Sequence, residues 1–170
     1  MKTLTALVAN VLLGFSILAG MLSTTALADE YTTGTVTINN PWSRPTPPGV
    51  PMGVGYMAIT NHGDSDVTLT GAATPRAKDV SIHESTMKDG TMSMRPLKDG
   101  LNIPAGETVK LKPHGYHLML EKLDAPLQEG QSIPMTVNFS GAETMAIELD
   151  VAPLDGDMQR KEQEMDHSGH

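Results

Sequence analysis

The chain has 170 residues and no cysteine, and its 12 basic and 20 acidic residues give a net charge of −8. An acidic chain of this kind is a poor partner for nucleic acid, and the missing cysteine excludes disulfides and dithiol redox chemistry. The length corresponds to one domain of common size, about 100 to 150 residues, with extensions.

An apolar stretch from Leu4 to Leu22 follows Lys2 and leads into the small-residue segment STTALA. This pattern predicts a secretory signal peptide over residues 1–28, cleaved after Ala28, so that the mature chain begins at Asp29. An uncleaved anchor is the alternative, because about 20 apolar residues can span a bilayer. We expect cleavage and release into the periplasm, with neither a lipid anchor nor stable membrane insertion afterwards.

Between Tyr31 and about Pro153 the sequence is a series of short apolar or alternating segments separated by turn residues. Such segments are typical of β-strands, and no long amphipathic helix is indicated. The expected strands are TVTINN (35–40), GYMAITN (55–61), DVTLTGA (66–72), DVSIHES (79–85), TVKLKP (108–113), YHLML (116–120), SIPMTVNF (132–139) and MAIELDV (145–151). About eight strands at this spacing predict an all-β fold, an antiparallel sandwich or barrel, over residues 29–153.

Two stretches depart from the strand pattern. Residues 40–55, NPWSRPTPPGVPMGVG, form a predicted Pro/Gly-rich connection that starts at Trp42. Residues 154–170, LDGDMQRKEQEMDHSGH, are polar and charged without periodicity, which predicts a disordered C-terminal tail.

The segment GYHLML raises the first functional question, because it places a histidine and a methionine two positions apart in an expected strand. Side chains alternate between the two faces of a strand, so His117 and Met119 share one face. Leu118 and Leu120 share the other, and we expect the leucines to face the core. The His/Met pair is then available for another role.

Two further segments present the same kinds of side chain. In DVSIHES, the alternation places Val80 and Ile82 on one face and His83 on the other. In GTMSMRP, Met92 and Met94 share a face if the segment is extended. Three segments therefore offer imidazole or thioether groups from faces that are not the expected core faces.

These ligand types indicate a metal. Thioether sulfur is soft and neutral, so a mixed His/Met set favours copper, and Cu(I) in preference to Zn²⁺, Mg²⁺ or Ca²⁺. A blue-copper centre is excluded, because it needs a cysteine thiolate. The alternative for any one of these residues is ordinary packing, since methionine commonly fills gaps in cores.

The spacing of the four residues adds a resemblance. Ten residues separate His83 from Met94, 22 separate Met94 from His117, and one separates His117 from Met119. With PWSRPTPPGVPMGVGYMAITN, HESTMKDGTMSMRP and IPAGETVKLKPHGYHLMLEKL, this spacing strongly resembles the PCuAC family of periplasmic copper chaperones. The resemblance covers nearly the whole mature domain. It implies a cupredoxin-like Greek-key barrel or sandwich in which His83, Met94, His117 and Met119 bind Cu(I).

The chain departs from the family pattern in two places. The interval between Met94 and His117 is one residue longer than usual, and the extra residue is expected in the loop LKDGLN. Members often have a methionine two positions after the first histidine, where this chain has Ser85. Met87 or Met92 is therefore an alternative to Met94 as the third ligand. His114 is expected at the surface, with a role as a lid or in transfer as the alternative.

The resemblance implies delivery of Cu(I) to the copper centres of respiratory haem–copper oxidases, that is, a part in cytochrome c oxidase assembly. The expected partner is an oxidase copper-centre subunit or a Sco-type thiol protein, and the carrier is expected to be a monomer without enzymatic activity. The alternatives are a periplasmic copper buffer or resistance protein, a copper redox enzyme, and a structural sandwich that binds no metal.

The last six residues suggest a second site. Met165, His167 and His170 lie close together in the expected tail, and some members of the family carry copper-binding extensions rich in His and Met. Asp166 and a terminal carboxylate add hard oxygen donors, so this segment is expected to prefer Cu(II).

Overall fold

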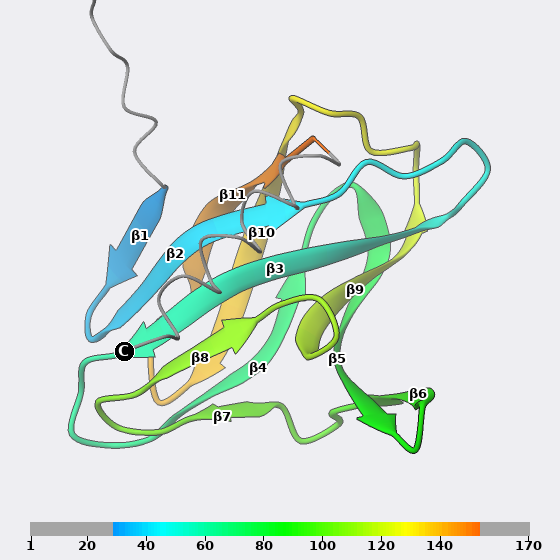
Figure 1. Ribbon diagram of the computed structural model, residues 1–170. Coiled ribbons are helices and arrows are strands. Elements are labelled where there is room, and N and C mark those ends of the chain that lie inside the picture. Colours follow the sequence, from blue (N-terminus) through cyan, green and yellow to red (C-terminus); the bar gives the residue numbers. More distant parts are fainter. Residues whose placement is uncertain (1–28, 154–170) are drawn as a thin grey trace, which may run out of the picture.

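The computed structural model describes residues 29–153, and its elements are eleven β-strands (Figure 1). The strands are β1 (Glu30–Thr33), β2 (Val36–Ser43), β3 (Met52–Asn61), β4 (Val67–Ala73), β5 (Ala77–Lys88), β6 (Thr91–Pro96), β7 (Leu101–Ile103), β8 (Thr108–Leu111), β9 (Tyr116–Leu123), β10 (Ser132–Ser140) and β11 (Met145–Val151). The expected signal peptide and tail lie outside the described residues. Within residues 29–153 no helix is long and apolar enough to cross a membrane.

The strands pair in the order β6-β5-β9-β8-β3-β2-β11-β10-β4-β7, with β1 beside β2 and a further pairing of β9 with β3. The all-β prediction is confirmed, but the expectation of a wholly antiparallel sheet is wrong in two places. Strands β8 and β9 are parallel, as are β2 and β11. The first case follows from geometry, because β8 and β9 both pair antiparallel with β3, one beside each half of that long strand.

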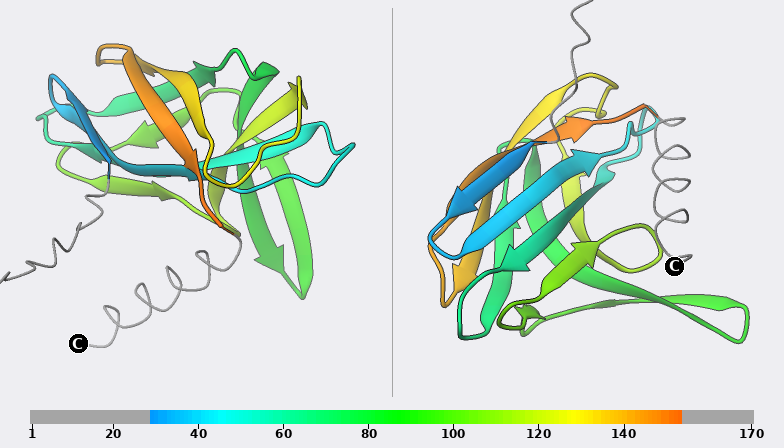
Figure 2. Two further views of the ribbon diagram at one scale, coloured as in Figure 1. Left: turned by 90° about the horizontal axis from the view of Figure 1, so that it is seen from above. Right: turned by 60° about the vertical axis from the view of Figure 1, so that its left-hand side comes forward.

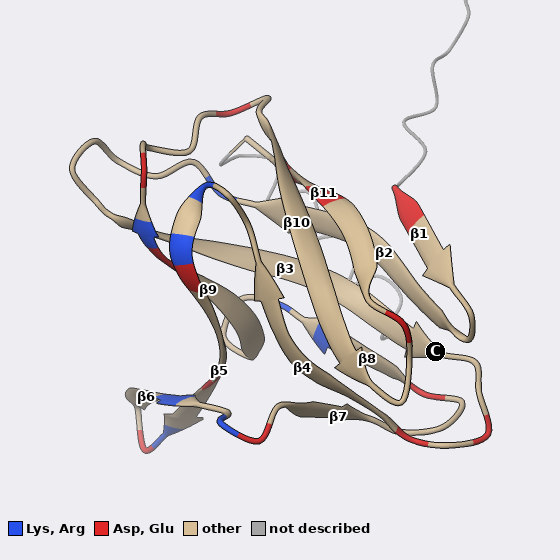
Figure 3. Cartoon of the chain, turned by 180° about the vertical axis from the view of Figure 1, so that it is seen from behind, with Lys and Arg blue, Asp and Glu red and all other residues tan. Residues whose placement is uncertain are grey.

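The curled sheet encloses one core. Figure 2 shows the strands wrapping around the interior, and β4 packs against β5 without pairing to it. The core consists mainly of aliphatic side chains, as a chain with few aromatic residues requires. Its fully buried members are Ile38, Ile59, Leu69, Ile103, Leu118, Leu120, Leu127, Ile133, Leu149, Val36, Val137 and Val151. Charged residues lie mainly in turns and at strand ends (Figure 3).

The expected connection over residues 40–55 is shorter in the structure. Strand β2 continues to Ser43 and β3 begins at Met52, so only residues 44–51 join them. An irregularity between Asn39 and Trp42 lets the strand continue past Pro41. Two contacts hold this end of β2 in the sheet: Trp42 packs against Tyr56 with ring centroids 4.6 Å apart, and Ser43 Oγ donates to the Val54 carbonyl at 2.6 Å.

Strands β5 and β6 form a hairpin that projects from the barrel, as both views of Figure 2 show. Strand β6 pairs only with β5, along the sequence from His83 opposite Pro96 to Lys88 opposite Thr91. The segment containing Met92 and Met94 is thus extended, the condition under which the two side chains share a face. The loop expected to absorb the extra residue joins β6 to β7 over residues 97–100.

Candidate metal centre

The alternation expected on β5 and β9 is present. Leu118 and Leu120 on β9 are completely buried in the core, and Val80 and Ile82 on β5 are buried with them. His117 therefore lies on the opposite face of the β9 ribbon, as predicted. The core thus holds β5 and β9 in place, and their other face is left to carry the polar and sulfur-containing side chains.

The pairing of β5 with β9 brings the two predicted histidines together. His83 is directly opposite His117, and the two ring centroids are 5.8 Å apart. Met119 lies opposite Ser81 on the same face, because it is two residues beyond His117. His117 is only 4% exposed, whereas His83 and Met119 are half-buried.

The hairpin adds the remaining predicted residue. Met94 on β6 is opposite Ser85, which is two residues beyond His83 on β5, so Met94 lies on the face of the histidines. Met92 is opposite Met87, one step further from the imidazoles towards the hairpin turn. The structure thus brings all four residues of the predicted set to one face, and Met94 is nearer to the histidines along the ladder than Met92.

His117 has one ring nitrogen engaged and one free. Its Nδ1 lies 3.1 Å from the carbonyl oxygen of Gly115. A carbonyl can only accept, so Nδ1 carries the proton and Nε2 has a free lone pair. Burial lowers the pKa of His117; the Gly115 contact opposes this shift and the charge of His83 adds to it. The fold therefore favours the neutral imidazole, the form that binds a metal.

His83 is oriented by a short chain of hydrogen bonds that reaches β9. Ser81 Oγ donates to Glu121 Oε1 at 2.7 Å, and its oxygen lies 3.0 Å from His83 Nε2. Since the single hydroxyl proton is given to the carboxylate, Ser81 accepts from Nε2–H, which leaves Nδ1 as the free nitrogen. Sequence reasoning missed Glu121, although it follows His117 and Met119 at the same two-residue interval.

The two free nitrogens have the character of metal ligands. His83 Nδ1 and His117 Nε2 are both buried, and neither has a hydrogen-bond partner within the described part of the chain. A buried polar atom without a partner costs about 1–3 kcal/mol, so it calls for a specific explanation. An ion that accepts both lone pairs would satisfy the two atoms together.

The surrounding donors select a soft ion. Within residues 29–153, no group of three or more His, Cys, Asp or Glu side chains is close enough to hold a metal ion. The imidazole pair therefore needs donors of another kind, and its face supplies the thioethers of Met94 and Met119. Nitrogen and neutral sulfur together favour Cu(I) over zinc or a hard cation.

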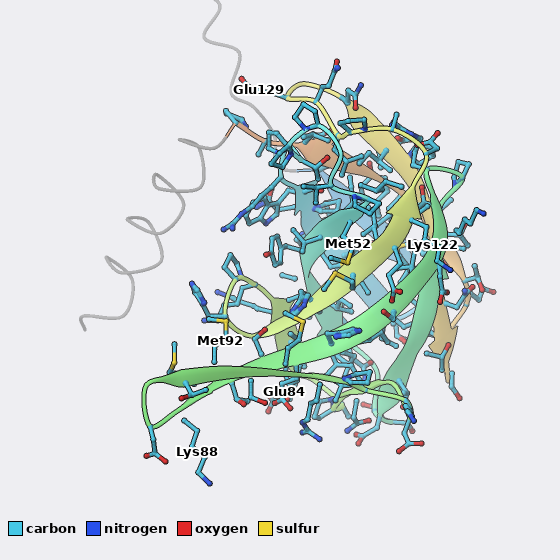
Figure 4. All side chains as sticks on the ribbon, turned by 90° about the vertical axis from the view of Figure 1, so that its right-hand side faces the viewer. Met52, Glu84, Lys88, Met92, Lys122 and Glu129 are labelled. Carbon is cyan, nitrogen blue, oxygen red and sulfur yellow. The ribbon has the colours of Figure 1, made fainter. Side chains whose placement is uncertain are left out.

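Two other histidines and Met52 are not part of the predicted set. His114 is exposed in the β8–β9 loop and has a positive φ of 62°, and His62 is hydrogen-bonded to Thr37. Met52 is on the same face as Met119, since Val54 pairs with Met119; Figure 4 shows it over β9, with Met92 on the projecting hairpin. The predicted tail site lies outside the described residues.

Comparison with known proteins identifies the family of the chain. The family described as "Putative lipoprotein LpqE-like" matches residues 36–151, more than half of the chain. A curated protein of Leifsonia xyli subsp. xyli (strain CTCB07), named "Putative lipoprotein Lxx21020", is 32% identical over 149 residues, which are 88% of this chain and 89% of the relative.

Solved structures of other proteins share the fold of this chain. The structure titled "Copper-bound PCuAC domain from PmoF2" has a TM-score of 0.64 at 24% identity, over 74% of this chain and 98% of that one. The "Solution structure of CuI-DR1885 from Deinococcus Radiodurans" has a TM-score of 0.55 at 29% identity, over 76% of this chain and 83% of that one. The cupredoxin-like fold and the PCuAC resemblance are both confirmed, and the chain belongs to the LpqE-like family.

Proposed function

We propose that this protein is an exported Cu(I) carrier of the periplasm that holds one ion through His83 Nδ1, His117 Nε2 and the thioethers of Met94 and Met119. The observation that carries the proposal is the pair of buried, unpartnered imidazole nitrogens on the face that also carries both thioethers. The predicted signal peptide and the family match support export and copper binding respectively.

The exposure of the ligands suits transfer of the ion. His117 is 4% exposed, while Met94 is 48% exposed on a strand that pairs with only one neighbour. A recipient can therefore replace the Met94 thioether first and the imidazoles afterwards, without release of Cu(I) to water. Neutral, soft ligands permit such stepwise exchange, and the ion keeps its oxidation state, so no catalysis is required.

The recipient that we propose is a copper-centre subunit of a haem–copper oxidase or a Sco-type thiol protein. The support is the family resemblance, in which delivery to respiratory oxidases is the described role. Thiolate and imidazole acceptors bind Cu(I) more strongly than a set that is half thioether, which gives the transfer its direction. The carrier acts as a monomer in this proposal.

A titration tests the site. The mature protein is titrated with Cu(I) against a colorimetric Cu(I) chelator, beside Met119→Leu and the buried core control Met145→Leu. We expect one tightly bound Cu(I) in the native protein and the control, and weaker binding in Met119→Leu, which retains volume but loses the sulfur. Full affinity in Met119→Leu would remove that residue from the ligand set.

A transfer assay separates a carrier from the alternatives. The Cu(I)-loaded protein is mixed with an oxidase copper-centre domain or with a Sco-type domain, and the copper content of each is measured after separation. We expect movement of the ion to one of these acceptors. Retention of copper in the presence of both would favour a buffer, and turnover of oxygen or superoxide by the loaded protein would favour a redox enzyme.

We also propose a Cu(II) site in the segment of Met165, His167 and His170. Two imidazoles with nearby carboxylates suit the harder Cu(II) ion, and a tethered site would raise the copper concentration at the barrel to the mM range. The mature protein is expected to bind one Cu(II) more than a chain ending near Leu154, while both bind Cu(I) alike. Equal Cu(II) uptake by the two proteins would refute this second site.

A further inference from the structure

The projecting β5–β6 hairpin has two chemically distinct faces. On one face the opposed pairs are His83 with Pro96, Ser85 with Met94, and Met87 with Met92. The intervening pairs point the other way and are polar or charged: Glu84 with Arg95, Thr86 with Ser93, and Lys88 with Thr91. Arg95 Nε donates to Glu84 Oε2 at 2.8 Å, and charges of both signs mark the hairpin in Figure 3.

The methionines of the hairpin do not serve as core residues. Met87 is 64% exposed and Met92 46%, and every residue of β6 is exposed. Methionines that do fill the core differ clearly, since Met57, Met135 and Met145 are all less than 5% exposed. The end of the hairpin that contains Met87 and Met92 buries neither face, so packing does not explain why its thioethers gather on one of them.

The thioethers continue the metal face outward. On β5, His83, Ser85 and Met87 follow one another at two-residue intervals, and on β6 Met94 and Met92 lie opposite the last two. Directly opposed residues have Cβ atoms about 4.5–5.5 Å apart, and diagonal neighbours about 7–8 Å. The flexible side chain of Met94 is thus within reach of both His83 and the Met87–Met92 pair.

We propose that Met87 and Met92 form a second, weaker Cu(I) site near the hairpin turn, from which the ion passes through Met94 to the imidazole pair. This inference rests on the proposed function of the inner site. Two neutral thioethers bind a soft monovalent ion, but without imidazole they hold it less strongly than the inner set. The first step exchanges metal–sulfur bonds of Met87 and Met92 for the bond to Met94 sulfur, and the next exchanges metal–sulfur for metal–nitrogen bonds at the imidazoles. All of these ligands are neutral, so the ion keeps its charge and no oxidant, reductant or proton is needed.

Residue-resolved titration tests the outer site. The mature protein, labelled with ¹³C in its methionine methyl groups, is titrated with Ag(I), a redox-stable soft ion. We expect the first equivalent to shift the methyl resonances of Met94 and Met119, and further Ag(I) to shift those of Met87 and Met92. Unchanged Met87 and Met92 resonances at excess Ag(I) would overturn the outer site. Unchanged Met94 and Met119 resonances would instead overturn the proposed function.

A kinetic comparison tests the relay. Met87→Leu/Met92→Leu retains the apolar surface but removes both sulfurs, and Thr86→Ala/Ser93→Ala, a pair on the opposite face of the same hairpin, is the matched control. We expect the double variant to load Cu(I) from a chelator about tenfold more slowly, since the ion is no longer concentrated beside Met94. Its equilibrium affinity for the first ion should equal that of the control. Equal loading rates in the two variants would overturn the relay.

Discussion

The two faces of the β5–β9 pair differ in composition and in purpose. The inner face carries Val80 and Ile82 from β5 with Leu118 and Leu120 from β9, all buried. The outer face carries serine, histidine and methionine at the alternate positions, with polar atoms left for an ion. One pair of strands therefore stabilises the core on one side and carries the candidate ligands on the other. Substitutions on the inner face should mainly lower stability, and substitutions on the outer face should mainly weaken metal binding.

The largest effect is expected from an inner-face truncation. Leu118 is completely buried, so Leu118→Ala should lower the free energy of unfolding by about 2–5 kcal/mol through lost burial and the cavity that remains. Met119→Leu, one residue away on the outer face, should cost less than about 1.5 kcal/mol. Denaturant unfolding of the two apo variants measures the difference, and similar losses would contradict the division between the faces.

Removal of an outer-face ligand should change the affinity for Cu(I) more than it changes stability. His117→Gln replaces the free Nε2 by a hard amide group, so Cu(I) affinity should fall by more than about a hundredfold, above the 10–100-fold that outer partners of ligands contribute. His62→Gln is the control, since His62 bonds to Thr37 away from this face. Competition with a Cu(I) chelator measures both variants; an unchanged affinity in His117→Gln would exclude the histidine from the site.

A smaller loss is expected when the orientation of a ligand is disturbed. Ser81→Ala breaks the hydrogen-bond chain from Glu121 to His83 Nε2, so the affinity for Cu(I) should fall by about 10–100-fold while the ligands stay in place. Ser81→Thr retains the hydroxyl and should recover most of the affinity. Equal weakening by both variants would point to packing instead of hydrogen bonding.

The two adjacent methionines of β6 offer a finer comparison. Met94 lies one step nearer to the imidazoles than Met92, although the two are almost equally exposed. Met94→Leu should therefore weaken the binding of the first Cu(I) by about tenfold, the low end of the range for outer partners of ligands, because Met94 is the most exposed of the four ligands. Met92→Leu should leave that affinity unchanged. The measurement is the same chelator competition, and the reverse order would show that Met92 is the third ligand.

The smallest effect should come from pH. The pKa of a free histidine side chain is about 6.5, and burial lowers the pKa of His117 below that value. Cu(I) affinity should therefore be constant at neutral pH and fall below about pH 6, as protons compete with the ion for His117. Between the unfolded and folded pKa values the unfolded state binds more protons, so the apo protein should also lose stability as the pH falls. Chelator competition and unfolding at pH 5 and 7 test both signs; full affinity at pH 4 would mean that the thioethers alone hold the ion.

Local alternation allowed much of the site to be predicted from the sequence. A period of two places His117 and Met119 on one face whatever the strand pairs with, and the same holds for His83 and Ser81. Strands with strong alternation were predicted well. Strands β1, β6 and β7 were not among the expected strands. Strands β1 and β7 contain only four and three residues, and every residue of β6 is exposed, so no core face marks it. The parallel pairs were missed because the relative direction of two strands depends on the neighbours that they share in the sheet.

The sequence by itself determined the all-β class, the core and outer faces of the strands, and the soft character of the donors, because these depend on residue type and local periodicity. Only the tertiary structure decided that His83 lies opposite His117, which nitrogen of each ring is free, and that Glu121 orients His83 through Ser81. These features depend on the register between β5 and β9. That register is fixed by the packing of Ile82 and Leu118 in a core to which distant strands contribute, so no short stretch of sequence contains it.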